Sequence, residues 1–265
     1  MSTLLKQLKD FHAPEEGMFV EKLNDLTKQF KDIAEIILCK GYLCFGDKHV
    51  YIRDVEFYYH EEEGDIKDPI MYHVNEKAPN DKRDYYKMGT FNFHVSGIDI
   101  TFEKENFRAS ALIRGFSVDD PNCPKYENRP TYLYEFFNNS ITPFGKSMSI
   151  EWQDKDINAK GKIMQTFRKN VPLYRSKTDK TKIILCPNYV KEGRYHYEPI
   201  PFNEKDSIND IDEPSYRRLD IDICQTITSQ KLQDTIHLWR FCRDVNLKDK
   251  EWKDEKGKEI GKYLP

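Results

Sequence analysis

Residues 49–59 read HVYIRDVEFYY, an alternation of apolar and polar side chains that is typical of a long β-strand. Steps of two place Asp54, Glu56 and Tyr58 on one face together with Ile52. Apolar and aromatic neighbours weaken the hydration of a carboxylate, which makes it a stronger base near neutral pH. Glu56 is therefore the first candidate for chemistry. The alternative is an exposed polar face of a half-buried strand.

The segments around this strand predict a helix and further strands. Residues 18–38 carry apolar side chains at steps of three and four, which indicates an amphipathic helix. Residues 91–102 alternate around Gly97, which predicts a hairpin with one apolar and one polar face. Residues 109–116 predict another apolar strand that carries the single cation Arg114.

The second half of the sequence is less regular. Residues 130–138 predict a short helix, 182–187 a strand, and 229–245 a helix. We expect residues 1–265 to form a single α+β domain with helices at both ends and a mainly antiparallel sheet between them. The mixed-charge segment 248–265 is expected to be a solvated tail.

Charge and composition narrow the function. The 265 residues contain 42 Lys and Arg against 45 Asp and Glu, so the chain as a whole has no net positive charge to attract a polyanion. A polyanionic partner would have to bind at a local cluster of basic residues. Residues 157–182, with eight Lys or Arg and one Asp, are the best candidate, although a charge run is also typical of a solvated face. The apolar runs are too short to span a bilayer, and the N-terminus lacks a secretory pattern.

The sequence predicts neither a metal site nor a cofactor site. Its six cysteines form no Cys-x-x-Cys pair, which indicates reduced thiols in a cytoplasmic protein. His60, His73 and His94 have no ligand spacing, and no phosphate-binding glycine loop is present. Nucleotide hydrolysis and kinase chemistry therefore lack support.

Three further features are candidate site elements. Arg114 must find a carboxylate or phosphate, and both an ion pair with Glu56 or Asp54 and a catalytic role satisfy that need. His73 follows an acidic loop and either lines a site or lies on the surface. The polar hairpin face, which is either a binding face or a solvated one, carries Asn92, His94, Ser96, Asp99 and Thr101.

Four motifs in sequence order resemble the alkyladenine (3-methyladenine) DNA glycosylase family. They are Val55-Glu56-Phe57-Tyr58, the segment 68–73 that ends in His73, the segment 88–94 that reads MGTFNFH, and Leu112-Ile113-Arg114. The resemblance covers residues 30–118, and it depends on the order of the motifs. It implies a strongly curved sheet flanked by helices.

The resemblance also implies roles for individual residues. Glu56 would activate water, and Arg114 would orient that carboxylate or the target's phosphate. Tyr58 and His73 would wall the pocket for the base. His94 stands where the family places a stacking tyrosine.

At the hairpin tip, Ser96 lies near the family's gap-filling residue. Asn92 and Asp99 add hydrogen-bonding groups to the same polar face, which favours a polar base over a simple methylated purine. The family's base-screening asparagine has no secure counterpart, although Asp99 or Thr101 could serve.

The implied function is a monofunctional DNA N-glycosylase that flips out a base and leaves an abasic site. Its partner would be double-stranded DNA with a flipped nucleotide, and the protein would act as a monomer without metal or cofactor. We expect a polar hypermodified base of bacteriophage DNA as substrate, in antiviral defence. The alternatives are routine repair of alkylated purines, an inactive ligand- or partner-binding member of the fold, and an unrelated α+β protein in a complex.

Overall fold

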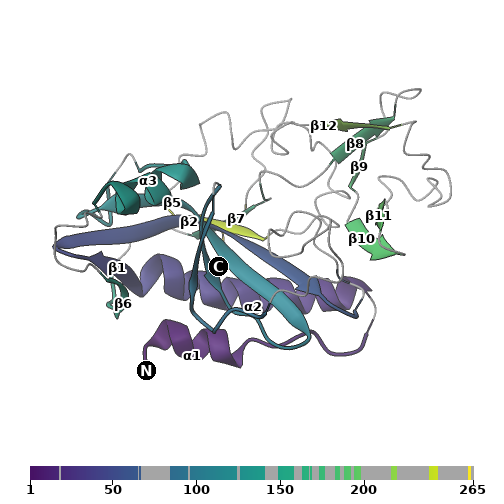
Figure 1. Ribbon diagram of the computed structural model, residues 1–265, viewed down its shortest axis with the longest axis horizontal. Helices are drawn as coiled ribbons and strands as arrows, with labels where there is room; N and C mark the ends of the chain where they lie inside the picture. Colours follow the sequence, from purple (N-terminus) through teal and green to yellow (C-terminus); the bar gives the residue numbers. More distant parts are fainter. Residues whose placement is uncertain are drawn as a thin grey trace.

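The structure of the chain is a computed structural model. It describes residues 1–17, 19–64, 66, 84–94, 96–123, 126–140, 149–157, 163–166, 168 and 239–243, and the backbone of short strands at 173–176, 183–185, 188–191, 194–197, 216–219 and 262–263. The architecture is mixed α/β: an antiparallel sheet curls into a half-barrel, and helices accompany it (Figure 1). The mainly antiparallel sheet expected from the sequence is confirmed.

The described helices are α1 (Thr3–Asp10), α2 (Phe19–Cys39) and α3 (Pro130–Ser140). The main sheet contains β1 (Gly41–Phe45), β2 (Lys48–Glu61), β3 (Phe91–His94), β4 (Gly97–Thr101), β5 (Phe107–Val118), β6 (Ile150–Asp154), β7 (Ile163–Thr166), β13 (Arg240–Arg243) and β14 (Lys262–Tyr263). Its order is β14-β7-β13-β2-β5-β4-β3, and β1 pairs with both β2 and β6.

Shorter strands form two further sheets. In one, β8 (Leu173–Ser176) pairs with β9 (Ile183–Leu185) and β12 (Tyr216–Leu219). In the other, β10 (Asn188–Lys191) pairs with β11 (Arg194–Tyr197).

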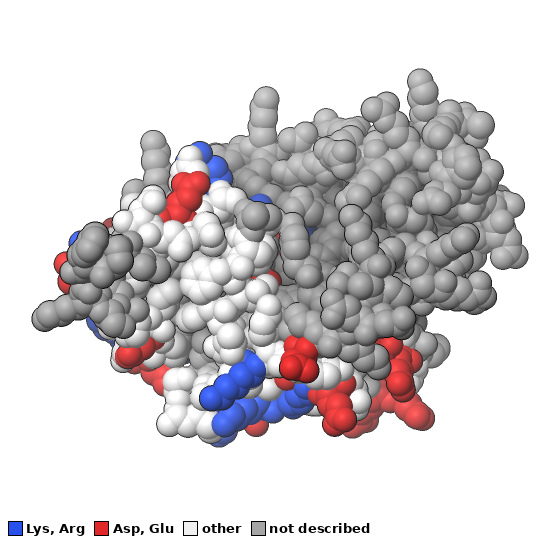
Figure 2. Space-filling model, in the orientation of Figure 1, with Lys and Arg blue, Asp and Glu red and all other residues white. Residues whose placement is uncertain are grey.

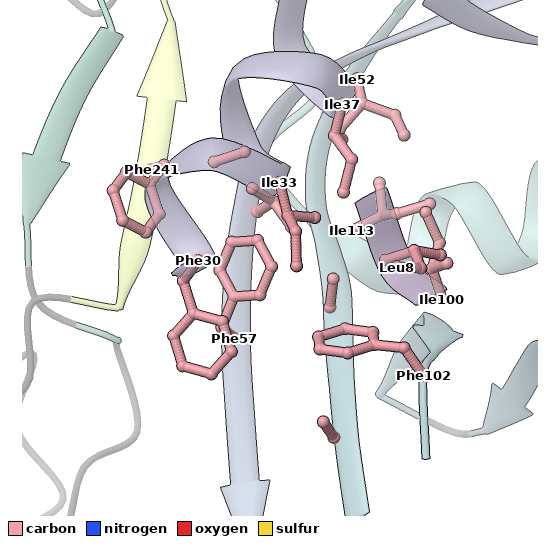
Figure 3. Packing of buried hydrophobic residues seen from close by; sticks show 14 of the residues in the cluster. Leu8, Phe30, Ile33, Ile37, Ile52, Phe57, Ile100, Phe102, Ile113 and Phe241 are labelled. Atoms are coloured by element: carbon pink, nitrogen blue, oxygen red, sulfur yellow. The ribbon is translucent and has the colours of Figure 1, made fainter. Parts of the chain in front are cut away.

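One face of the main sheet packs against α1 and α2 and forms the hydrophobic core (Figure 1). The apolar stripe of α2 is fully buried at Leu26, Phe30, Ile33 and Ile37. Phe30 stacks on Phe57 of β2 with ring centroids 4.7 Å apart. Figure 3 shows Phe30 and Phe57 beside Phe241 of β13, so the core joins α2 and β2 to β13.

A double irregularity between β2 and β5 changes which residues face this core. The pairs are Ile52–Phe116, Asp54–Gly115 and Val55–Ile113, so Arg53 and Arg114 each have no directly opposed residue. As a result Ile52 and Val55 both join the core cluster. The strict alternation predicted from the sequence, which placed Ile52 on the face of Glu56, is therefore wrong.

The helix predicted over residues 229–245 is also wrong at its C-terminal end. Residues 240–243 form β13, which is inserted between β2 and β7 in antiparallel register. Long-range pairing overrides the helical spacing, because Trp239 and Phe241 enter the core while Arg240 lies on the opposite face. Residues 229–238 lie outside the described residues. Within the predicted tail, Lys262–Tyr263 pair with β7.

Several other predicted elements are confirmed. They are α2, the β3–β4 hairpin, β5, α3 and the strand β9. Each has a local sequence pattern that is strong enough to define it, whereas the two errors above depend on contacts between distant segments.

Candidate active site

The sheet registers place the candidate residues in one row on the face opposite α2. The row runs from Asn92 through Asp99, Leu112 and Glu56 to Arg240, each aligned with the next across neighbouring strands. Aligned residues share a sheet face. The row therefore brings residues from position 56 to position 240 of the chain to one surface of the sheet.

Glu56 lies at the centre of this face and has no exposed surface. Its Oε2 accepts a hydrogen bond of 2.8 Å from the Tyr58 hydroxyl and lies 3.6 Å from Nη1 of Arg114. Its Oε1 lies 3.9 Å from Nε of Arg240. The structure thus brings together three predicted site residues, Glu56, Tyr58 and Arg114, and shows the Arg114–Glu56 ion pair that the sequence left open.

Asp54 and Arg240 form a buried ion pair next to Glu56. Nη2 of Arg240 donates to Asp54 Oδ2 at 2.6 Å, and its Nε donates to Oδ1 at 3.0 Å. Burial alone would lower the pKa of Arg240, but the charge and hydrogen bonds of Asp54 raise that pKa well above its ordinary value. The guanidinium therefore stays charged.

Arg168 packs against the aromatic rings next to the site. Its guanidinium lies 4.8 Å from the ring centroid of Tyr58 and 5.1 Å from that of Trp239. Its Nη1 donates to the carbonyl oxygen of Phe57 at 3.1 Å. Burial, and secondarily the charge of Glu56, raise the pKa of Tyr58 well above its ordinary value, so the hydroxyl keeps the proton it donates.

Sequence reasoning missed both Arg168 and Arg240. The signal for Arg240 lies in residues 239–242, which read WRFC and alternate an aromatic residue with arginine or cysteine. Such a period of two is typical of a strand, and it was hidden inside a longer helical spacing.

The remaining hairpin residues form a second group on the same face. Nε2 of His94 lies 3.3 Å from Asp99 Oδ2, and Nδ1 of His94 accepts from the backbone N–H of Ser96 at 3.2 Å. Asn92 Oδ1 accepts from the hydroxyl of Tyr86 at 3.0 Å. Asp99 is 3% exposed, so this face is not simply solvated. One strand separates Asp99 from Glu56, a distance of roughly 10 Å.

Two predicted features are not placed with the site. His73 lies outside the described residues. Of the basic segment 157–182, the structure describes the side chain of one cation, Arg168, and that side chain is 2% exposed. Arg168 is therefore part of the buried cluster and not a surface contact for phosphate.

The surface view shows no continuous basic patch among the described residues of this side of the molecule. Acidic and basic side chains are interspersed along the lower edge, below a broad area without charged groups (Figure 2). A cavity of about 680 Å³ lies on the helix side of the sheet, where Glu61, Glu62 and Arg108 line it. It is separate from Glu56.

Within the parts of the chain that the structure describes, no group of three His, Cys, Asp or Glu residues is arranged to hold a metal ion. The cysteines described there, Cys39, Cys44, Cys123 and Cys242, form no disulfide bond with one another. The described helices include none that is long and apolar enough to cross a membrane.

Comparison with protein families, with characterised proteins and with solved structures gives no match. The chemistry of this site is therefore inferred from its geometry. A fully buried glutamate contacts a tyrosine hydroxyl and lies between two guanidinium groups, on a sheet face that also carries a histidine–aspartate pair.

Proposed function

We propose that the protein is a DNA N-glycosylase with a fold like that of the alkyladenine DNA glycosylases. The observation that carries the proposal is the environment of Glu56, whose carboxylate accepts the Tyr58 hydroxyl and faces the Arg114 guanidinium. Both contacts favour the ionised carboxylate that a water-activating base needs. The order of motifs along the sequence supports the same assignment.

In the proposed reaction, the target nucleotide leaves the base stack and its sugar reaches Glu56. As the N-glycosidic bond breaks, its electron pair leaves with the base and positive charge develops on the sugar. The carboxylate stabilises this charge and takes a proton from the attacking water, whose oxygen bonds to C1′. The products are a free base and an abasic site.

We propose a polar modified base as the substrate, with hypermodified bacteriophage DNA as its source and antiviral defence as the role. His94 and Asp99 supply hydrogen-bonding groups on the face of Glu56, where a stacking tyrosine would supply only ring area and one hydroxyl. The neighbouring Asn92 and Ser96 add further polar groups. Repair of alkylated purines is the alternative substrate class.

One observation favours a second candidate function. Glu56 has no exposed surface, so sugar and water reach its carboxylate only if DNA binding uncovers this face. A protein of the same fold in which the buried cluster is purely structural would bind a ligand or partner without cleaving a bond. The assay below separates the two.

The test is base release from DNA by the wild-type protein and by Glu56→Gln. We expect more than a tenfold loss of rate, because the amide keeps the volume but is no base. Glu61→Gln is the matched control, since Glu61 also lies on β2 and accepts from a tyrosine two residues away, Tyr59, but on the opposite face. Its rate should match the wild type.

Three DNA substrates complete the experiment: unmodified, methylated and phage-derived hypermodified DNA, with abasic sites counted in each. Release from hypermodified DNA alone supports the proposed substrate, and release of methylated purines alone supports repair. If Glu56→Gln kept more than about a tenth of the rate, Glu56 would not be the base. Abasic sites from none of the three would refute the glycosylase and favour the binding protein.

A further inference from the structure

We propose that Arg240 is a positioning residue that holds Glu56 in its ionised form, and that Asp54 limits how strongly it does so. Strand β13 would then supply part of the active site. The chemical use of the carboxylate rests on the proposed function, whereas the control of its charge rests on the buried geometry alone.

The guanidinium of Arg240 is shared between two carboxylates. Its Nε lies 3.0 Å from Asp54 Oδ1 and 3.9 Å from Glu56 Oε1. Its Nη2 lies 2.6 Å from Asp54 Oδ2. All three side chains are at most 1% exposed, so water screens these interactions little. Arg240 is thus close enough to Glu56 to favour its charge, while its direct hydrogen bonds go to Asp54.

Other charged or titratable groups face Glu56 from the neighbouring strands. Tyr58 contributes a hydroxyl donor from β2, and Arg114 contributes a cation at 3.6 Å from β5. Arg168 lies behind the ring of Tyr58, and Asp99 lies one strand beyond β5. These groups are unchanged when the Asp54–Arg240 pair is altered, so the contribution of the pair can be isolated.

The arrangement predicts opposite effects for two variants. Asp54→Asn removes an anion and leaves the charge of Arg240 undivided, so Glu56 should titrate at a lower pH. Asp54→Asn/Arg240→Gln removes both charges. Because Arg240 is in contact range of Glu56 while Asp54 lies two residues along the strand, the net loss is a stabilising cation. Glu56 should then titrate at least about one pH unit higher than in the wild type.

The double variant also avoids leaving an unpaired charge in the protein interior. Replacing only Arg240 leaves Asp54 buried without its cation, a change that is strongly destabilising. The double substitution replaces both charged groups by amides, which are able to hydrogen-bond to each other, and leaves neither charge buried alone. Far-UV circular dichroism of each variant verifies that the protein is folded before its titration is interpreted.

The experiment is a carboxyl ¹³C NMR titration of the full chain labelled at glutamate, with the Glu56 signal assigned by its loss in Glu56→Gln. Glu61 is the internal control, and its midpoint should not move. A higher Glu56 midpoint in the double variant, together with a lower one in Asp54→Asn, supports the proposal. A Glu56 midpoint that does not rise in the double variant, or that does not fall in Asp54→Asn, overturns it.

Failure of this inference and failure of the proposed function give different results. If the wild type releases no base but the Glu56 midpoints move as expected, the control of charge stands and the glycosylase does not. If base release occurs while the midpoints stay fixed, the glycosylase stands and Arg240 has only a structural role. In an active enzyme, the acid limb of the rate profile should move with the NMR midpoint.

Discussion

Replacing Trp239 by Ala is expected to lower the free energy of unfolding by about 3–5 kcal/mol. The side chain is 1% exposed, and its ring centroid lies 5.1 Å from that of Phe30 in α2. Its Nε1 donates to Thr27 Oγ1 at 2.9 Å. Trp239→Phe keeps an aromatic ring but loses that hydrogen bond and some volume, so we expect a smaller loss of about 1–2 kcal/mol.

The assay is urea unfolding followed by far-UV circular dichroism, because the substitution itself changes the fluorescence. Phe93→Ala serves as the control, since Phe93 is 42% exposed and its loss should cost less than about 1 kcal/mol. A loss below about 1 kcal/mol for Trp239→Ala would contradict the packing of residues 239–243 into the core.

Three further predictions address the backbone, pH and metals. Gly97→Ala should cost about 1–3 kcal/mol in urea unfolding, because the φ of Gly97 is +140° and a Cβ there would lie 2.9 Å from Pro130; unchanged stability would contradict the conformation. The backbone N–H of His49 and the ammonium group of Lys48 lower the pKa of Asp119. The ionised Asp119 carboxylate therefore stabilises the fold above pH 3.8, the ordinary pKa of an aspartate, and this stabilisation is lost as the pH falls further. Between pH 5 and pH 3 the urea midpoint of Asp119→Asn should fall less than that of the wild type, and an equal fall would contradict the link. Base release should persist in EDTA, because the proposed mechanism activates water with a carboxylate; loss that a divalent metal restores would contradict that mechanism.

Much of the fold follows from local patterns in the sequence. The apolar spacing of α2 and the alternation of the β3–β4 hairpin define their elements without help from the rest of the chain. The irregularity at Arg53 and Arg114 was not predictable in this way, because a bulge changes the pairing of two strands and leaves no mark on the spacing of either.

The contacts of the candidate site also differ in whether local sequence patterns predict them. The grouping of Glu56 with Tyr58 follows from their positions two residues apart on one strand. The need of Arg114 for an anionic partner follows from its apolar neighbours in the sequence. The contact of Arg240 with Asp54 joins residues 186 positions apart, so it depends on a register that short-range spacing does not encode.

The central position of β13 has a consequence for how the protein is made. During synthesis, residues 1–157 leave the ribosome with β2 already able to pair with β5, but the side of β2 that receives Arg240 stays open until residue 243 emerges. Until then the nascent chain presents an unpaired strand edge, and Asp54 lacks its arginine partner. Chains truncated before residue 239 should therefore aggregate in expression trials, and the demand for chaperones should persist until residue 243 has emerged.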